Sequence, residues 1–377
     1  MEAPLPPEPD THLFEQVDAL RREMDGLFAV ADTTLDYPNK GHIRFRGRLL
    51  CEPADCYGEL RRRFERYGYT PMVTTEDDGR TSVVALPVVF THGRTRWIIN
   101  LVLFLLTIAS TLYVGAGYGA TTQAEALQIW RGWPFAASIL LILGAHEMGH
   151  YFAARRHDVP VTLPFFIPMP FSYFGTLGAF IQLRGPASNR RALFDVAVAG
   201  PLAGLAFALP LLLYGLATSD LGPIAPGQPF EGNSLLYLLA KLVVFGRVLP
   251  GGGVDVYLNQ VAWAGWVGLF VTGLNLIPVG QLDGGHIAYS LLGDRARRLF
   301  WPVILSLALI IVYSWLQGAP AVTWGLWIVL LLAFGRYHAR PLEDISGLDP
   351  RRRVLGVLTL ALFFLCFVPL PLVAIAR

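Results

Sequence analysis

The chain has 377 residues, of which 54% are hydrophobic and only 15% are charged, and its mean hydropathy is +0.47. This composition excludes an ordinary soluble enzyme and indicates a membrane protein. Its 30 basic and 28 acidic side chains nearly cancel, so neither a nucleic-acid footprint nor an acidic tail is indicated. We therefore expect the lipid bilayer, and no nucleic acid, among its partners.

Charge is concentrated near the amino terminus, where residues 1–96 hold 13 basic and 16 acidic groups. The first ten residues lack the basic start and apolar core of a cleaved targeting segment. Beyond them we predict a helix over 14–27, a strand over 42–51, an Arg-rich helix over 53–67, and strands over 68–76 and 80–90 joined by a turn at Asp77, Asp78 and Gly79. This order predicts a small soluble α+β domain over residues 1–92.

The chain contains three cysteines, Cys51, Cys56 and Cys366. Three are too few for a disulfide scaffold, and the gap between the first two is not a usual zinc spacing. We therefore predict reduced, structural thiols.

From Trp97 onward apolar stretches dominate, and residues 93–377 are predicted to form a transmembrane domain. Seven stretches are expected to span a bilayer, at about 20 residues each. They cover residues 97–115, 134–154, 192–217, 256–277, 299–316, 321–335 and 354–376. A shorter apolar stretch at 234–249 carries Lys241 and Arg247 and predicts an interfacial helix.

The basic residues of the loops predict an orientation. If the amino-terminal domain is cytosolic, the loops on that side carry thirteen arginines, and the opposite loops carry three basic residues. This bias follows the positive-inside rule. We therefore expect a multi-pass protein of the cell membrane with its amino-terminal domain in the cytosol.

The second predicted span carries an H-E-x-x-H pattern at His146, Glu147 and His150. Residues four apart lie on one helix face, so the two imidazoles can reach a single metal ion, with Glu147 beside them as general base. Imidazole nitrogen suits Zn²⁺. Because ionisable groups at membrane depth cost about 2.5–3.5 kcal/mol each, such a cluster predicts a function more strongly than a structural role.

A further ligand is needed, and Asp283 is the candidate. It lies in the sequence NLIPVGQLDGGH at the end of the 256–277 stretch. Pro278 and the glycines at 280, 284 and 285 are expected to break the helix and to aim this carboxylate at a neighbouring helix. A Pro/Gly-rich loop that simply ends a helix would explain the turn but not a buried Asp.

HEMGH together with Asn275-x-x-Pro278-x-x-x-x-Asp283-Gly284 resembles the paired signature of the site-2 proteases, and the similarity is best over residues 97–290. The resemblance implies zinc held by His146, His150 and Asp283, Glu147 as catalytic base, and Asn275 positioning the substrate or the oxyanion. His286 could support this site. The chain between Ala217 and Asp255 is too short for a PDZ domain, which implies the PDZ-less branch of the family.

Other segments also match this family. Residues 164–185 lack a helical period and resemble its re-entrant β-hairpin, whose edge could pair with an extended substrate; an ordinary interfacial loop is the alternative. Gly200, Pro201 and Gly204 match its Gly-Pro feature and are assigned to helix packing. Asp195 is interpreted as a partner of a helix dipole, not as a ligand.

The expected function is therefore regulated intramembrane proteolysis by a polytopic α-helical zinc metalloprotease acting on transmembrane protein substrates. A cleft open to the cytosol should admit water to the site. The alternatives are a membrane transporter that uses the His/Asp cluster as a transit site, or a scaffold without activity. The sequence does not indicate an oligomeric state.

Overall fold

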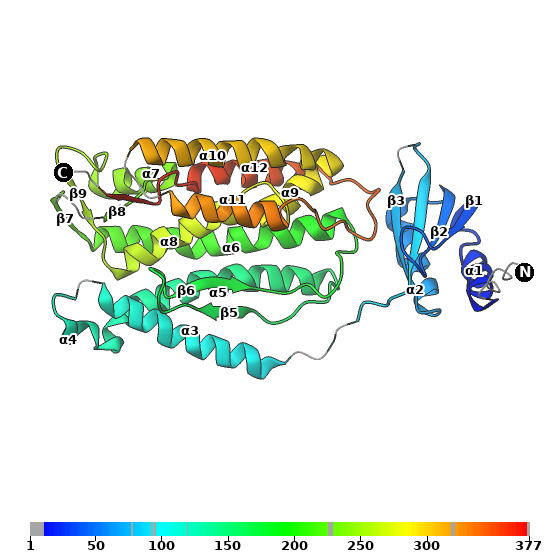
Figure 1. The fold of residues 1–377 in the computed structure, drawn as a ribbon, viewed down its shortest axis with the longest axis horizontal. Coiled ribbons are helices and arrows are strands. Elements are labelled where there is room, and N and C mark those ends of the chain that lie inside the picture. The colour runs from blue at the N-terminus through cyan, green and yellow to red at the C-terminus, as the bar shows by residue number, and fades with distance from the viewer. Residues whose placement is uncertain are drawn as a thin grey trace, which may run out of the picture. The chain divides into compact units, whose positions relative to one another are not determined.

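A computed structural model describes residues 11–76, 78–91, 93, 96–118, 120–224, 229–317 and 321–374. The chain divides into two compact units, which are described separately (Figure 1). The first unit contains residues 1–92 together with two short segments, 184–190 and 340–347. The second contains the remaining residues. The first ten residues, the predicted turn residue Asp77 and Arg377 lie outside the described residues.

The first unit is built on a four-stranded antiparallel sheet in the order β1-β2-β4-β3. Its elements are α1 (Thr11–Glu23), β1 (Phe28–Leu35), β2 (Ile43–Leu49), α2 (Pro53–Glu65), β3 (Thr70–Thr75) and β4 (Thr81–Leu86). Strand β1 was not predicted. Its register shifts between Val30 and Asp32, and such a bulge breaks the alternation by which strands are recognised.

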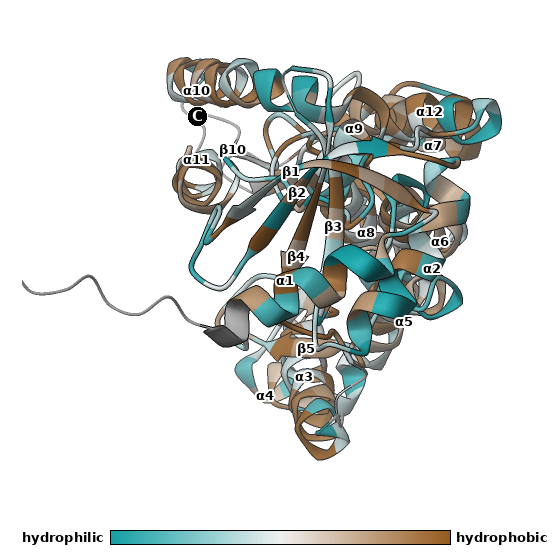
Figure 2. Ribbon diagram, turned by 90° about the vertical axis from the view of Figure 1, so that its right-hand side faces the viewer, coloured by the Kyte–Doolittle hydropathy of each residue, from teal (hydrophilic) through white to brown (hydrophobic). Residues whose placement is uncertain are grey.

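The core of this unit joins both helices to the sheet. Leu20 of α1 and Leu60 and Phe64 of α2 are fully buried in one cluster with Phe45 of β2 and Val83 of β4. Leu60 and Phe64 are four residues apart and therefore share one face of α2. The outward faces of both helices are largely hydrophilic (Figure 2).

The two short segments cover the outer edge of β3. The N–H of Val73 donates to the carbonyl of Leu342 (2.6 Å), and the carbonyl of Val73 accepts from the N–H of Asp344 (2.9 Å). The N–H of Leu342 donates in turn to the carbonyl of Ala187 (2.8 Å). The side chain of Leu342 is 1% exposed and belongs to the core of the unit. Pairing of this kind covers the outer edge of β3 at Val73.

The prediction of reduced thiols is wrong for two cysteines, because the structure joins Cys51 and Cys56 in a disulfide. Cys56 lies in the first turn of α2, and Cys51 precedes the helix, so their Cα atoms are 6.0 Å apart. That separation suits a disulfide. Cys366 is free and buried.

The second unit is mostly helical. Its helices are α3 (Trp97–Gly117), α4 (Gln123–Ala126), α5 (Trp133–Arg156), α6 (from Arg190 to Ala217), α7 (Leu235–Phe245), α8 (Gln260–Asn275), α9 (Asp283–Leu292), α10 (Phe300–Leu316), α11 (Val322–Phe334) and α12 (Pro350–Cys366), with 3₁₀ turns at Ile129–Gly132 and Gly293–Leu299. Within the described chain, three helical stretches are long and apolar enough to cross a membrane: α3, α6 and Asp283–Leu316. Brown, hydrophobic ribbon dominates α3, α10 and α11 (Figure 2). The chain is thus a membrane protein.

Short strands pair at the ends and along the sides of these helices. They are β5 (Phe165–Pro168) with β6 (Thr176–Phe180), β7 (Asp220–Pro223) with β9 (Val254–Tyr257), and β8 (Pro229–Glu231) with β10 (Leu372–Ala374), all antiparallel. The prediction of one helical stretch over 354–376 is therefore wrong beyond Cys366. Pro369 and Pro371 cannot continue the helix, and the chain turns into β10.

Helix α7, in the stretch predicted to be interfacial, carries a buried charge. Lys241 is 0% exposed, and its Nζ donates to Oδ1 of Asp255 at 3.1 Å. Beside this pair, the Tyr237 hydroxyl donates to Oε1 of Glu231 at 2.7 Å, and all four side chains are buried. The charge of Lys241 is thus compensated inside the protein and does not need an interface.

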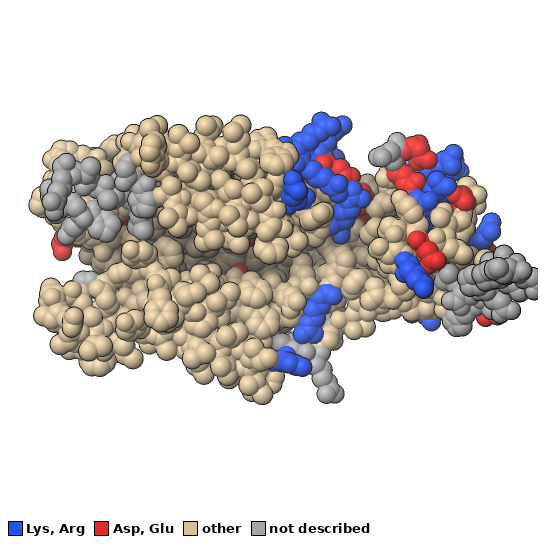
Figure 3. Space-filling model, in the orientation of Figure 1, with Lys and Arg blue, Asp and Glu red and all other residues tan. Residues whose placement is uncertain are grey.

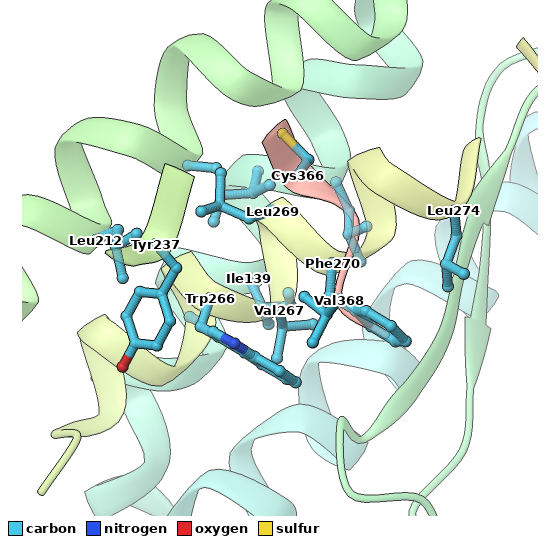
Figure 4. Close-up of a cluster of buried hydrophobic side chains, with 14 of the residues drawn as sticks. Ile139, Leu212, Tyr237, Trp266, Val267, Leu269, Phe270, Leu274, Cys366 and Val368 are labelled. Atoms are coloured by element: carbon cyan, nitrogen blue, oxygen red, sulfur yellow. The ribbon is translucent and has the colours of Figure 1, made fainter. Parts of the chain in front are cut away.

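Helix α8 runs through the core of the second unit. Trp266 and Phe270 stack with their ring centroids 5.6 Å apart, in one cluster with Ile139 of α5 and Leu212 of α6 (Figure 4). A Cβ on Gly268 would lie 2.8 Å from Cβ of Ala208, so the glycine allows close packing of α8 against α6. This packing fixes the position of the α8 carboxyl end, where the chain approaches α5.

Polar side chains of α3 hold the β5–β6 segment. The Asn100 amide donates to the carbonyls of Leu163 and Pro164, both at 2.9 Å, and the Ser110 hydroxyl donates to the carbonyl of Gly175 at 2.6 Å. Gly175 has φ +68°, and a Cβ there would lie 2.8 Å from Cα of Thr111. The chain just before β5 and the turn just before β6 are therefore both hydrogen-bonded to α3.

Candidate metal centre

The H-E-x-x-H residues lie in the middle of helix α5, where their side chains are buried. His146 and Glu147 are each 5% exposed and His150 is 6% exposed. The two histidines are four residues apart and share one helix face, so their Nε2 atoms lie only 3.1 Å apart. The helix thus presents two converging imidazoles.

The loop between α8 and α9 delivers Asp283 to the same point. Helix α8 ends at Asn275, and α9 begins at Asp283, so the helix is interrupted where the sequence predicts. Gly280 has φ +63°, and a Cβ on Gly284 would lie 2.1 Å from the carbonyl of Leu276. Only glycine permits so tight a return of the backbone. Asp283 is consequently the first residue of α9 and faces α5.

The three candidate ligand atoms form a nearly regular triangle. Oδ2 of Asp283 lies 3.3 Å from Nε2 of His146 and 3.3 Å from Nε2 of His150. The third edge, between the two Nε2 atoms, is 3.1 Å. Tetrahedral Zn²⁺ with bonds of about 2.0–2.1 Å holds its ligand atoms about 3.3 Å apart. The triangle therefore fits one face of a zinc tetrahedron and leaves the fourth position open.

Helix α6 lies directly behind the histidines. His150 Nδ1–H donates to the carbonyl of Val196 at 2.7 Å, in the tautomer that leaves Nε2 free for a metal. A Cβ on Gly200 would lie 2.1 Å from Nε2 of His150, and one on Gly204 would lie 3.2 Å from Cβ of His146. These glycines therefore pack, as predicted, and the group they pack against is the histidine pair.

Two further groups border the open side of the triangle. The amide Nδ2 of Asn275 lies 3.2 Å from Nε2 of His146. The backbone N–H of Ile181, directly after β6, faces the carboxylate of Glu147. A donor, a carboxylate and a strand end thus converge beside the position where a metal would sit.

The structure brings all five predicted site residues together, and their chemical roles stay predictions. His286 lies one turn into α9, and within the described chain its Nδ1 has no hydrogen-bond partner. The sequence did not reveal the contribution of Val196 or of the Ile181 N–H, because a backbone group leaves no residue-specific signal. Gly200 was visible as a small residue, but its partner was not.

Comparison with known proteins shows which family the chain resembles. Residues 134–313 match the sequence model described as "Peptidase family M50". This stretch is thus similar to the domains of peptidase family M50. It contains all three candidate ligands, Glu147 and Asn275. No solved structure matches the chain.

The chain is also similar to curated plant proteins. It is 32% identical over 379 residues to "Probable zinc metalloprotease EGY2, chloroplastic" of Arabidopsis thaliana, covering 95% of this chain and 65% of that one. It is 30% identical over 304 residues to "Probable zinc metalloprotease EGY1, chloroplastic" of Oryza sativa subsp. japonica, covering 73% and 51%. The chain thus spans less than two thirds of these relatives. Their names place them in chloroplasts, so the expectation of a cell membrane gains no support.

Proposed function

We propose that the protein is an intramembrane zinc metalloprotease that hydrolyses peptide bonds within or near transmembrane segments of other proteins. The observation that carries this proposal is the triangle of His146, His150 and Asp283, with edges of 3.1, 3.3 and 3.3 Å beside the buried Glu147. The donor set of two imidazoles and one carboxylate suits Zn²⁺ and leaves one position for chemistry. The match of residues 134–313 to peptidase family M50 supports the same function.

In this mechanism the residues of the chain have separate tasks. When bound, the zinc ion supplies Lewis acidity to the scissile carbonyl and to water. Glu147 takes the proton of the attacking water and later delivers it to the leaving amine. Asn275, whose amide borders the triangle, donates a hydrogen bond to the substrate carbonyl as negative charge develops on its oxygen.

The substrate is an extended stretch of a transmembrane segment, because a closed helix hides its carbonyls in hydrogen bonds. Strand β6 ends beside Glu147, so a substrate strand paired with the edge of the β5–β6 hairpin would place a carbonyl at the base. A groove runs along one face of the second unit, with acidic atoms visible at its floor (Figure 3). We propose that this groove receives the substrate and that the hairpin is re-entrant.

The proposal includes a topology. Besides the three long apolar stretches, α5, α8, α11 and α12 would complete seven spans, with residues 1–92 as a soluble domain. Basic side chains gather at one end of the helices (Figure 3). By the positive-inside rule, this supports our proposal that this end and the opening of the site face the inner side of the membrane, and we propose the same side for residues 1–92. For a protein of the cell membrane this side is the cytosol.

A transporter or an inactive scaffold remains the alternative class. A transit path needs several ligand groups in succession, and among the described residues the one cluster close enough to hold a metal is His146, His150 and Asp283. A scaffold has no use for a buried carboxylate beside that cluster. No observation favours either alternative.

Replacing Glu147 tests the proposal. Glu147→Gln keeps the shape of the side chain but removes the base, so cleavage of a transmembrane reporter should fall by about 10²–10⁴-fold while bound zinc is retained. The assay compares purified wild-type and variant protein in liposomes, with metal content measured in parallel. Glu125→Gln, on the short helix α4, is the matched control and should cleave normally. Undiminished cleavage by purified Glu147→Gln protein would contradict the proposal.

A further inference from the structure

A charged cluster outside the candidate site joins three helix ends. Asp195 lies on α6, Arg352 and its neighbour Asp349 lie at the start of α12, and His157 follows α5. Arg352 donates from Nε to Oδ1 of Asp195 at 2.7 Å and from Nη2 to Oδ2 at 2.6 Å. Nε2 of His157 lies 2.8 Å from the same Oδ2. The carboxylate of Asp195 is thus shared by all three helix ends.

The start of α12 is itself fixed to Arg352. Oδ1 of Asp349 accepts the N–H of Arg352 at 3.1 Å as a helix cap, and Oδ2 accepts from Nη1 at 2.6 Å. The guanidinium and the capping N–H hold the pKa of Asp349 at about 2, so this carboxylate is charged at any physiological pH. A two-bond fork of this kind requires arginine, because lysine cannot present two parallel donors.

The cluster adjoins the backbone that orients a predicted zinc ligand. Asp195 immediately precedes Val196, whose carbonyl accepts the Nδ1–H of His150 at 2.7 Å. Any movement of this turn of α6 therefore moves the acceptor that holds the His150 ring and its tautomer. Groups that orient ligating histidines typically affect metal affinity or activity by 10–100-fold.

The same cluster adjoins the other half of the site. On α12, a Cβ at Gly356 would lie 2.9 Å from the Phe194 ring of α6 and 3.1 Å from Leu291 of α9. Helix α12 therefore packs closely against α6, which orients His150, and against α9, which begins with Asp283. The Asp195–Arg352 ion pair is the polar bond between α12 and α6 at this junction.

We propose that Asp195 and Arg352 are positioning residues that set the spacing between the histidine half and the aspartate half of the metal centre. The inference rests on the proposed function and assigns Asp195 a role beyond that of a helix-dipole partner. Neither residue is one of the three candidate ligands; both act through α6 and α12.

The test uses the full-length protein and zinc itself as the probe. Arg352→Lys keeps the charge but loses the fork, and Asp195→Asn loses the charge but keeps the shape. Each should weaken zinc affinity by about 10–100-fold, measured in competition with a chelator. Each should also lower kcat, with a smaller change in KM. The visible spectrum of the Co²⁺-substituted protein should lose intensity, because a distorted site departs from tetrahedral geometry. Arg353→Lys, one residue away and exposed, is the matched control and should leave all three measurements unchanged.

A double variant separates positioning from general stability. If the two residues act as one unit, Asp195→Asn/Arg352→Lys should bind zinc no more weakly than the weaker single variant. Variants that melt earlier but keep wild-type zinc affinity and Co²⁺ spectrum would overturn the proposal and leave the pair as a structural ion pair. His146→Ala separates a failure of this proposal from a failure of the proposed function. If His146→Ala also binds zinc normally, the proposed metal centre itself is wrong.

Discussion

The two units use charged side chains in opposite ways. In the first unit ion pairs such as Arg46–Asp32 and Arg62–Glu59 lie at the surface, where water screens them. In the second unit charges are sparse along the helices, and the buried ones sit in defined pairs, such as Lys241–Asp255. Surface charge in the first unit therefore contributes little to its stability, whereas a charge inside the second unit identifies a position with a specific task.

The strongest test of this contrast removes space beside a buried titratable group. In Gly200→Ala the added methyl would lie 2.1 Å from Nε2 of His150, so the ring must leave the triangle. We expect bound zinc to be lost and proteolysis to fall by at least about 100-fold. Metal analysis and the reporter assay measure both. Gly144→Ala on α5 has its nearest neighbour at 4.0 Å and should behave like wild type; zinc retained in Gly200→Ala would contradict the geometry.

The next test leaves a buried charge without its partner. Lys241→Met removes the partner of Asp255, which is 4% exposed, and should lower the free energy of unfolding by about 3–5 kcal/mol. Thermal unfolding in detergent measures this. The double variant Lys241→Met/Asp255→Leu should recover much of the loss, because no charge is then buried without a partner. A single variant as stable as wild type would mean that the pair is hydrated.

The smallest effect is expected in the first unit. Arg46→Gln removes the partner of Asp32 at the surface of the sheet. Because water solvates the freed carboxylate, the melting temperature should stay within replicate scatter of the wild-type value. A clear drop in melting temperature would show that charge in the first unit is as structural as it is in the second unit.

Local sequence patterns predicted much of the fold. The long apolar stretches located the long helices, and glycine and proline located the break before Asp283, because these signals depend on neighbouring residues. Strand β1 was missed because its bulge disturbs the alternation. The Cys51–Cys56 disulfide was missed because composition says little about a pair brought together by one helix turn.

Long-range contacts outside the predicted metal centre could not be predicted. The proximity of Gly200 to His150 and of Asp195 to Arg352 depends on how helices pack, and no spacing along the chain encodes it. The same holds for Leu342, which reads as one residue of a loop after α11 and yet lies in the core of the first unit. The sequence identified the chemically unusual residues, whereas the structure identified what holds them in place.

The covered edge of β3 has a consequence for how the protein can be divided. A chain shortened to begin after residue 92 would keep Leu342 and Asp344 but lose the strand that pairs with them. Residues 1–92 alone would expose the edge of β3 and lack the leucine that closes their core. Both fragments would therefore expose surfaces that are prone to association and that are covered in the intact chain. The two units are separately compact, yet truncating the chain at one position cannot produce either unit complete.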